Sequence, residues 1–405
     1  MIRKIAQIYR NAFSGLPRAA WMLSFVELVN RSGTMVLFFL TLYLTREKGY
    51  TLEAAGQVLA ACGLGSLVGA YLGGWLCDRL GAFTVQKLSL ALTGVLLVTA
   101  SFLSGFPAIA TIWFAIGMVN EAMHPANAAA MSRVCPPAIR TKGFALNRMA
   151  VNLGVTIGPV VGGFLALVDY RYLFWVDGLT SAIAAGVFVL FFGAGEPPLA
   201  GSTNRAAADE ALRSERSPWR DRPFLLLLLA VVGIGLVFIQ VFSTLPIYLR
   251  TVYGLRENRI GQLLAVNTVM IVFFEMVLMD FVKRWRPLQV VALGALFFGC
   301  GFSLLPFGSS FAFAALSVAV WTVGEMLTMP LLTTVIAGRG GEANRGRYLG
   351  LFGLAFSLAL MLGPIIGSRV YETFGPDVLW LGSGALALVI YLNVLALRHR
   401  IEETI

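Results

Sequence analysis

Hydrophobic residues run along the chain in long blocks, which short polar segments separate. A helix needs about 20 mostly apolar residues to cross the hydrocarbon core of a bilayer. Twelve blocks reach this length: 19–45, 54–77, 85–105, 108–131, 143–167, 172–193, 223–249, 259–281, 288–308, 311–337, 347–371 and 378–397. Several contain Gly or Pro, which membrane helices tolerate when neighbouring helices satisfy the freed backbone groups. The pattern predicts an all-α polytopic membrane protein with twelve transmembrane helices.

The composition supports this prediction and argues against a soluble enzyme. Hydrophobic residues make up 58% of the chain and charged residues 13%, whereas soluble domains average about 45–50% apolar and about 25% charged residues. No lysine precedes a serine or threonine, so the sequence lacks the phosphate-binding loop of an ATP-driven pump. We expect no enzyme activity, no cofactor and no metal site, because the sequence has neither a metal-binding histidine pair nor a GxSxG motif.

Basic residues are distributed unevenly between the two sets of predicted loops. The chain carries 31 Lys and Arg against 21 Asp and Glu, a net charge of +10. With the N-terminus inside, 22 basic residues fall on its side of the membrane and 7 fall in the loops of the other side. This asymmetry follows the positive-inside rule. It predicts a multi-pass protein of the bacterial cytoplasmic membrane with both termini cytoplasmic, and it accounts for the basicity without a nucleic acid partner.

A polar segment divides the predicted helices into two groups of six. Residues 196–222 are rich in Pro, Gly, Ser and charged residues, which is typical of a flexible linker. The predicted order is an amphipathic cytoplasmic N-terminus, a six-helix bundle, the linker, a second six-helix bundle and a cytoplasmic tail: 1–18, 19–195, 196–222, 223–397 and 398–405.

The two halves repeat one another at an offset of 205 residues. This offset superposes Pro125 on Pro330, Arg140 on Arg345, Gly158 on Gly363, Pro159 on Pro364 and Gly162 on Gly367. A parallel repeat predicts a pseudo-two-fold axis along the membrane normal. The substrate site is then expected between the halves near the midplane, where each side of the membrane reaches it in turn.

Two glycine-containing motifs occur in the first half. The loop after the second predicted helix reads Gly74-Trp-Leu-Cys-Asp78-Arg79-Leu-Gly81, and the fifth predicted helix contains Gly154-xxx-Gly158-Pro159-xx-Gly162-Gly163. An acid and a base at a short turn can bridge to a neighbouring helix end and stabilise one conformation. Small residues let helices approach closely, and proline bends a helix. Arg148, near the start of the fifth helix, is expected to brace the contact between the halves.

These motifs resemble the GxxxDRxG loop motif and the antiporter motif of the major facilitator superfamily, and the resemblance extends over essentially the whole chain. It implies the fold of that superfamily and a secondary transporter that works by alternating access. The loop lacks the usual basic pair after its second glycine, where Ala82 and Phe83 stand, and Trp113 replaces the arginine expected in the fourth helix. The antiporter motif is frequent among exporters and favours export over import.

The first and tenth predicted helices also resemble a second group of transporters. Glu27-Leu-Val-Asn30-Arg31 is similar to the ExxER signature of proton-coupled oligopeptide transporters, with Asn in place of the second Glu. Gly324-Glu325 resembles their GE-containing helix, in which the Glu serves the peptide amino terminus. Proton-coupled import of small peptides therefore stays open as an alternative to export, and a uniporter is the third alternative.

Ionisable side chains at membrane depth are costly and persist where they are paired or used. Glu27 and Arg31 are four residues apart, which places them within salt-bridge reach on one helix face. They form either a proton-coupling pair or a permanent pair that fixes the first helix. Asp177, near the end of the sixth predicted helix, either pairs with an arginine or titrates.

The resemblance implies that the first, fourth, seventh and tenth helices line the substrate cavity. The candidates for proton coupling are Glu27, Arg31, Glu121 and Glu325, and the candidates for the cavity are Asn30, His124, Asn127, Gln240, Ser243 and Glu325. Their carboxylates predict an acidic cavity suited to protons and to cationic or amine-bearing substrates. Alternatively, a carboxylate caps a helix break near Pro125 or Pro330, and His124 is a packing residue. We expect a monomeric, proton-coupled exporter of small amphipathic or cationic compounds.

Overall fold

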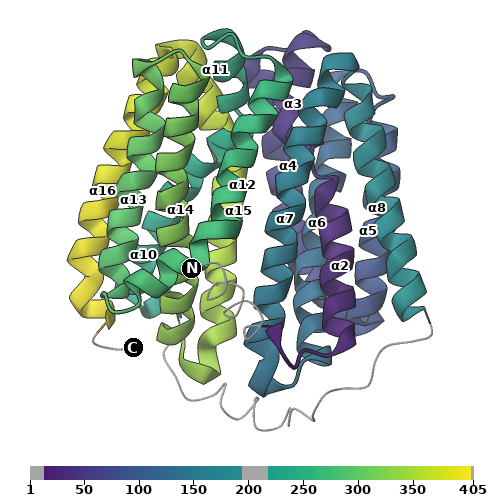
Figure 1. Ribbon diagram of the computed structural model, residues 1–405, viewed down its shortest axis with the longest axis vertical. Coiled ribbons are helices and arrows are strands. Elements are labelled where there is room, and N and C mark those ends of the chain that lie inside the picture. The colour runs from purple at the N-terminus through teal and green to yellow at the C-terminus, as the bar shows by residue number, and fades with distance from the viewer. Residues whose placement is uncertain (1–12, 194–217, 403–405) are drawn as a thin grey trace. The chain divides into compact units, whose positions relative to one another are not determined.

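The computed structural model describes residues 13–193 and 218–402, which are almost entirely helical (Figure 1). The α-helices are α2 (Arg18–Ser32), α3 (Val36–Arg46), α4 (Leu52–Leu80), α5 (Ala82–Ala100), α6 (Phe106–Val134), α7 (Arg140–Val168), α8 (Arg171–Phe192), α10 (Arg222–Phe238), α11 (Leu245–Thr251), α12 (Glu257–Val282), α13 (Pro287–Leu304), α14 (Phe311–Arg339), α15 (Gly341–Phe374) and α16 (Pro376–Glu402). Short 3₁₀ turns are η1 (Pro137–Ile139), η2 (Pro218–Arg220), η3 (Ile239–Val241) and η4 (Leu305–Phe307). Within the described residues, twelve stretches are long and apolar enough to cross a membrane, which confirms the predicted architecture.

Two of the stretches predicted as continuous helices are broken. The first consists of α2 and α3, which residues 33–35 separate, and the seventh consists of α10, η3 and α11. We refer to them as helix 1 and helix 7. Most of the predicted amphipathic N-terminus and most of the predicted linker lie outside the described residues. Part of the predicted tail is helical, because α16 continues to Glu402.

The described residues form two compact units. The N-terminal unit contains residues 13–36 and 65–193, and the C-terminal unit contains residues 37–64 and 218–402. Besides the linker, the chain therefore passes from one unit to the other at two places. One crossing directly follows the break in helix 1, and the other lies within the continuous helix α4.

In the N-terminal unit, α5 packs against α6 and α8, and α2 packs against α7 and α8. Buried apolar side chains such as Leu23 and Met123 form its core. The C-terminal part of α4 approaches α6 along Gly65, Gly69 and Gly73, where a Cβ atom would collide with the α6 backbone. Such small-residue stripes allow membrane helices to pack at short range.

In the C-terminal unit, α13 packs against α14 and α16, and α10 packs against α15 and α16 (Figure 1). Three buried aromatic rings join α13 to its neighbours. The ring centroid of Phe302 lies 5.5 Å from that of Trp321 on α14 and 5.9 Å from that of Trp380 on α16. Aromatic pairs of this kind contribute about 0.5–1.5 kcal/mol beyond their buried area, so this cluster holds the centre of the unit together.

Residues 37–64 belong to the C-terminal unit because they pack on its helices. The Glu53 amide at the start of α4 donates to Oε1 of Glu372 at 3.1 Å. A Cβ atom at Gly56 or Gly63 would lie within 2.9 Å of backbone atoms of α15. This grouping differs from a division of the chain at the linker, because residues 37–64, which include most of α3 and the first part of α4, pack on α15 and its neighbours.

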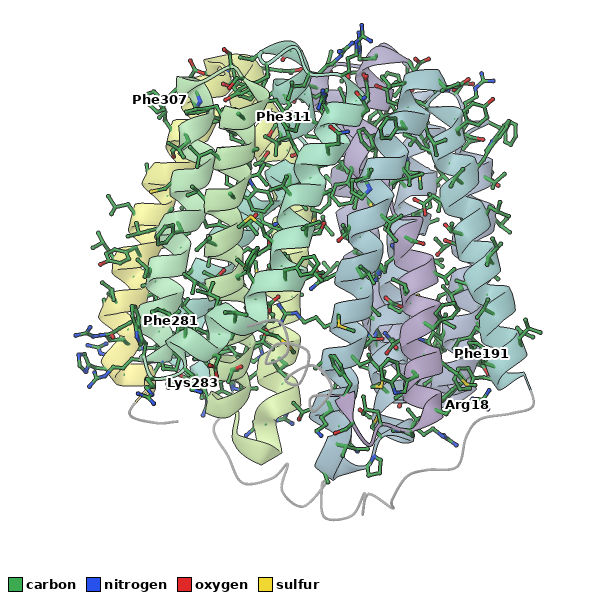
Figure 2. The ribbon with its side chains drawn as sticks, in the orientation of Figure 1. Arg18, Phe191, Phe281, Lys283, Phe307 and Phe311 are labelled. Atoms are coloured by element: carbon green, nitrogen blue, oxygen red, sulfur yellow. The ribbon has the colours of Figure 1, made fainter. Side chains whose placement is uncertain are left out.

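Aromatic side chains are exposed at the ends of the helices. Figure 2 shows Phe281 and Lys283 at one end of the C-terminal unit and Phe307 at the other. Phe281 is 69% exposed and Phe307 is 71% exposed. Aromatic and cationic side chains at helix ends are typical of the two membrane–water interfaces. Their positions agree with a multi-pass membrane protein.

Asp221, at the start of α10, joins this helix to α14 and α15. Its carboxylate accepts hydrogen bonds from the Phe224 amide at 3.3 Å, from Arg339 at 2.6 and 2.7 Å, and from the Tyr348 hydroxyl at 3.0 Å. Arg339 also donates to the Arg400 carbonyl at 3.3 Å. Burial raises the pKa of Asp221, but these hydrogen bonds outweigh it and hold the pKa below its ordinary value.

We expect Asp221→Asn to lower the free energy of unfolding at neutral pH by about 3 kcal/mol, because the largely buried Arg339 loses its negatively charged partner. The pKa of Asp221 is lower in the folded than in the unfolded protein. Its carboxylate therefore stabilises the fold above the unfolded pKa of about 3.9, and the contribution disappears as pH falls through the folded pKa. Unfolding temperatures in detergent should differ at pH 7, and the difference should shrink as pH falls below about 4 and approaches the folded pKa. A difference that is constant with pH contradicts this assignment.

Gly69→Ala is expected to destabilise the protein by about 1–3 kcal/mol, because its methyl group collides with the Met118 carbonyl on α6. Gly74→Ala is the matched control, since it lies on the same helix and a Cβ atom there has nothing within 4 Å. Thermal unfolding in detergent compares the two variants. Equal unfolding temperatures would contradict the close packing of α4 on α6.

Candidate functional site

The break in helix 1 lies against α7. A Cβ atom on Gly154 would be 2.7 Å from Cβ of Arg31, and one on Gly158 would collide with the Thr34 carbonyl inside the break. Pro159, Gly162 and Gly163, the remaining residues of this motif, are buried in α7. The small residues of the predicted antiporter motif thus allow α7 to contact the end of α2 and the break.

Asp177 provides the hydrogen-bond acceptor that the break requires. From α8, its Oδ2 accepts from the backbone amides of Met35 and Val36, each at 3.3 Å. The first amides of a helix have no partner within the helix, so Asp177 caps the start of α3. The side chain is 7% exposed and forms no ion pair with any described residue. Asp177 thus bonds to the backbone of helix 1, an arrangement that the sequence did not predict.

Glu27, Arg31 and His124 form a chain of polar contacts. Nε of Arg31 donates to Oε1 of Glu27 at 2.9 Å, and its terminal Nη2 lies 3.2 Å from Nε2 of His124 on α6. Arginine has donors only, so Nε2 of His124 accepts in this contact. Glu27 is buried, and its Oε2 has no hydrogen-bond partner among the described residues. The predicted pair on helix 1 is therefore formed, and it extends to His124.

The other polar residues predicted in the N-terminal unit have different surroundings. Asn30 is buried, accepts from Ser181 of α8 at 3.2 Å and lies 3.8 Å from the sulfur of Met123. Asn127 is buried on α6, and its Oδ1 has no partner in the described part of the chain. Glu121 is half-buried on the same helix. Asn30 thus joins helices of one bundle. The side-chain oxygen of Asn127 can still accept a hydrogen bond.

Glu325 on α14 is hydrogen-bonded to α12. Nδ2 of Asn267 donates to Oε2 of Glu325 at 2.8 Å and contacts Oγ1 of Thr322 at 3.1 Å. Asn267 was not among the predicted site residues. Its signal in the sequence is an amide side chain near the middle of the apolar stretch 259–281.

Gln240 and Ser243 lie at the break in helix 7. Nε2 of Gln240 donates to the carbonyls of Leu236 and Gly363 at 2.9 and 3.0 Å, and its Oε1 accepts from Ser243 and Thr244 at 3.0 and 2.9 Å. Gln240 and Ser243 are buried. Their hydrogen bonds join the break to α15, and the predicted role in the substrate cavity stays a prediction.

The loop motif forms the turn between α4 and α5. Gly81 has a φ of 84°, a conformation that glycine adopts without strain, and it directly precedes α5. The guanidinium of Arg79 lies 4.1 Å from the ring centroid of Trp75, one turn earlier on α4. Asp78 is exposed. Their predicted role in stabilising one conformation, like the bracing role of the exposed Arg148, stays a prediction.

Glu257 connects the end of α3 to α11 and α12. Its Oε1 lies 3.3 Å from Nη1 of Arg46 and 3.5 Å from Nε of Arg250. The side chain of Glu257 is 6% exposed, while that of Arg46 is 48% exposed. One buried carboxylate therefore holds the last residue of α3 on the C-terminal unit.

The profile of the Major Facilitator Superfamily matches residues 21–364. The chain belongs to this superfamily. The match spans the broken helix 1, the loop motif and most of both units, and it confirms the resemblance that the motifs predicted. The protein is thus a multi-pass membrane transporter and not an enzyme.

Relatives of this transporter cover nearly its whole length. It is 26% identical over 393 residues to the MFS-type transporter YttB of Bacillus subtilis (strain 168), covering 96% of this chain and 97% of that one. It is also 26% identical over 400 residues to the Na(+), Li(+), K(+)/H(+) antiporter of Planococcus maritimus, covering 88% and 91%. A third relative, the multidrug resistance protein MdtH of Yersinia enterocolitica, is 26% identical over 355 residues, covering 83% and 84%.

Solved structures show the same fold. The crystal structure of a peptide transporter POT in complex with alafosfalin superposes with a TM-score of 0.80 at 20% identity, covering 97% of this chain and 96% of that chain. A D-xylose–proton symporter superposes with a TM-score of 0.75 at 15% identity, covering 93% and 96%. At these identities the likeness concerns the fold of the transporter.

Glu257→Gln is expected to loosen the end of α3, because both arginines lose their negative partner. The expected effect is about 1 kcal/mol, or roughly fivefold faster amide exchange in residues 40–48, since Arg46 is half exposed. Hydrogen exchange with mass spectrometry measures this. Asp280→Asn is the control: its pair with Lys283 is exposed on both sides, and we expect no change. Unchanged exchange in Glu257→Gln would exclude this attachment.

Proposed function

We propose that this transporter exports small amphipathic or cationic compounds in exchange for protons, with its two bundles exposing the substrate site to each side of the membrane in turn. The buried carboxylate of Glu27 carries the proposal. One of its oxygens is paired with Arg31, and the other has no partner among the described residues. Buried polar atoms are normally hydrogen-bonded, so this oxygen is available to a proton or a cationic ligand.

Glu27 and Arg31 provide a way to exchange a proton for a cation. The ionised carboxylate is stabilised by the guanidinium at 2.9 Å. A proton on the second oxygen removes the negative charge and weakens the ion pair, and Arg31 keeps its contact with His124. A cationic substrate competes for the same carboxylate, because it needs the same negative charge. Binding of one ligand then releases the other, which is the requirement for exchange.

Glu325 is the second carboxylate in this proposal. It lies within a membrane-spanning helix, and Asn267 of α12 orients it through a hydrogen bond of 2.8 Å. An ionisable residue inside a membrane span marks a candidate site on general grounds. We assign to Glu325 the recognition of the positive group of the substrate, and to Glu121, half-buried on α6, a supporting negative charge.

Two relatives support export. At 26% identity over most of both chains, one is named a multidrug resistance protein and another a cation/proton antiporter. The first name concerns resistance to drugs and the second concerns exchange of cations against protons, and both agree with the direction that the antiporter motif favours. In this proposal the protein is a monomer in a bacterial cytoplasmic membrane, with both termini in the cytoplasm.

Exchange of monovalent metal cations for protons is the second candidate function. The Planococcus maritimus relative is named for it, and Glu325, Asn267 and Thr322 bring three oxygen-bearing side chains together. Import of small peptides, which the signatures of helix 1 and α14 favour, and uniport are the remaining alternatives.

Flux into and out of proteoliposomes under an imposed pH gradient tests the proposal. The panel consists of a lipophilic organic cation, Na⁺ and K⁺, and a tripeptide. We expect the organic cation to move against its gradient while protons move the opposite way. Glu27→Gln should reduce this proton-driven flux at least tenfold, because an amide cannot bind the proton, and Glu27→Asp should retain part of it.

Glu47→Gln is the matched control, because it removes a carboxylate from an exposed position after α3. Its flux should equal that of the parent. Full activity of Glu27→Gln contradicts the role of Glu27. Proton-driven movement of Na⁺ or K⁺ alone selects the second candidate, and tripeptide uptake along the proton gradient overturns export.

A further inference from the structure

The break in helix 1 lies at a crossing between the two compact units. Residues up to Val36 belong to the N-terminal unit, and Leu37 begins the segment that belongs to the C-terminal unit. Asp177 accepts hydrogen bonds from the backbone amides of Met35 and Val36, which are the last two residues before this crossing. The carboxylate of Asp177 therefore caps α3 at the place where the chain passes from the N-terminal unit to the C-terminal unit.

The repeat shows that the fold itself does not require an acid here. At the offset of 205 residues, the break in helix 7 corresponds to the break in helix 1, and Gly382 of α16 corresponds to Asp177. In the C-terminal unit the neutral side chain of Gln240 makes the hydrogen bonds at the break. The acid at position 177 is thus a property of one half of the repeat.

Few charges face Asp177 from the helices around it. The guanidinium of Arg31, at the end of α2, is the charged group that acts on it, and the same guanidinium is paired with Glu27. On the opposite side, α5 presents Gly94 and Val98 to this part of α8, and α7 presents Gly158 to the break. Arg31 is thus paired with Glu27 and acts on Asp177 only from beyond ion-pair distance.

Burial and the amide hydrogen bonds act on Asp177 in opposite directions. Removal from water disfavours the charged form of a carboxyl group, whereas two amide donors and the positive end of a helix favour it. A charged acceptor forms hydrogen bonds about twice as strong as a neutral one. Protonation would therefore weaken the cap and add an O–H group that needs a partner.

We propose that Asp177 is a proton-binding site that controls the break in helix 1, holding the start of α3 when ionised and releasing it when protonated. The site rests on the proposed proton coupling, to which it adds a second proton-binding carboxyl group. Arg31 interacts with both carboxylates. When a proton neutralises Glu27, the ion pair between Glu27 and Arg31 weakens, and the positive charge of Arg31 then acts mainly on Asp177. The protonation state of Glu27 thereby affects the hydrogen bonds at the break in helix 1.

Hydrogen exchange of the peptide covering residues 33–40, measured by mass spectrometry on the full-length protein in detergent, tests this site. After correction for the intrinsic rate, we expect protection in the parent to fall as pH is lowered through the range in which the Asp177 carboxylate takes up a proton. Asp177→Asn keeps an acceptor that does not titrate, so its protection should be constant. Asp177→Ala should exchange about fivefold faster at every pH, as expected for a lost cap.

Asp169→Asn is the control, because Asp169 is an exposed carboxylate next to the start of the same helix. It should keep the pH dependence of the parent. Two results overturn the inference: protection of residues 33–40 from exchange does not change with pH in the parent, or it still changes with pH in Asp177→Asn.

The experiment needs neither substrate nor gradient, so it separates the two proposals. Proton-driven flux together with flat protection refutes the Asp177 site and leaves the proposed function standing. Protection that depends on pH through Asp177, in a protein without proton-driven flux, supports the site and refutes the proposed function.

Discussion

Inside a bilayer no water is present to bond the backbone, so each helix completes its own hydrogen bonds or takes a partner from a neighbouring helix. The two interrupted helices of this protein show how that requirement is met. At the break in helix 1 the free amides bond to the carboxylate of Asp177, and at the break in helix 7 a free carbonyl bonds to the amide of Gln240. These partners, and the glycines that let α7 and α15 come close, hold each break against a neighbouring helix.

The glycine motif acquires a structural meaning from these contacts. Gly158 of α7 meets the backbone of the break in helix 1, and Gly363 of α15 meets Ile239 at the break in helix 7. The same residue type at the same place in both halves allows an interrupted helix to lie against an uninterrupted one. Part of the motif therefore reflects the fold and is independent of the direction of transport, which depends on the side chains that differ between the halves.

Much of the fold could be predicted from the sequence, because hydrophobic length is a direct consequence of bilayer thickness. The ion pair of Glu27 and Arg31 was also predictable, since both residues lie on one helix. The partners of Asp177, Glu257 and Glu325 were not, because each lies on a different helix and only packing brings them together. The attachment of residues 37–64 to the C-terminal unit escaped prediction for the same reason: the linker is a visible boundary in the sequence, whereas helix contacts are not.

Arg31 is paired with Glu27 and also acts electrostatically on Asp177, and this arrangement has an electrical consequence. With both acids ionised, Glu27, Arg31 and Asp177 together carry one negative charge within the membrane, and a single proton makes the group neutral. Moving one elementary charge through a membrane potential changes the free energy by about 2.3 kcal/mol per 100 mV. If the group moves through the membrane, the potential changes the free energy of its ionised form and leaves that of its neutral, protonated form unchanged. The membrane potential therefore shifts the balance between the two protonation states.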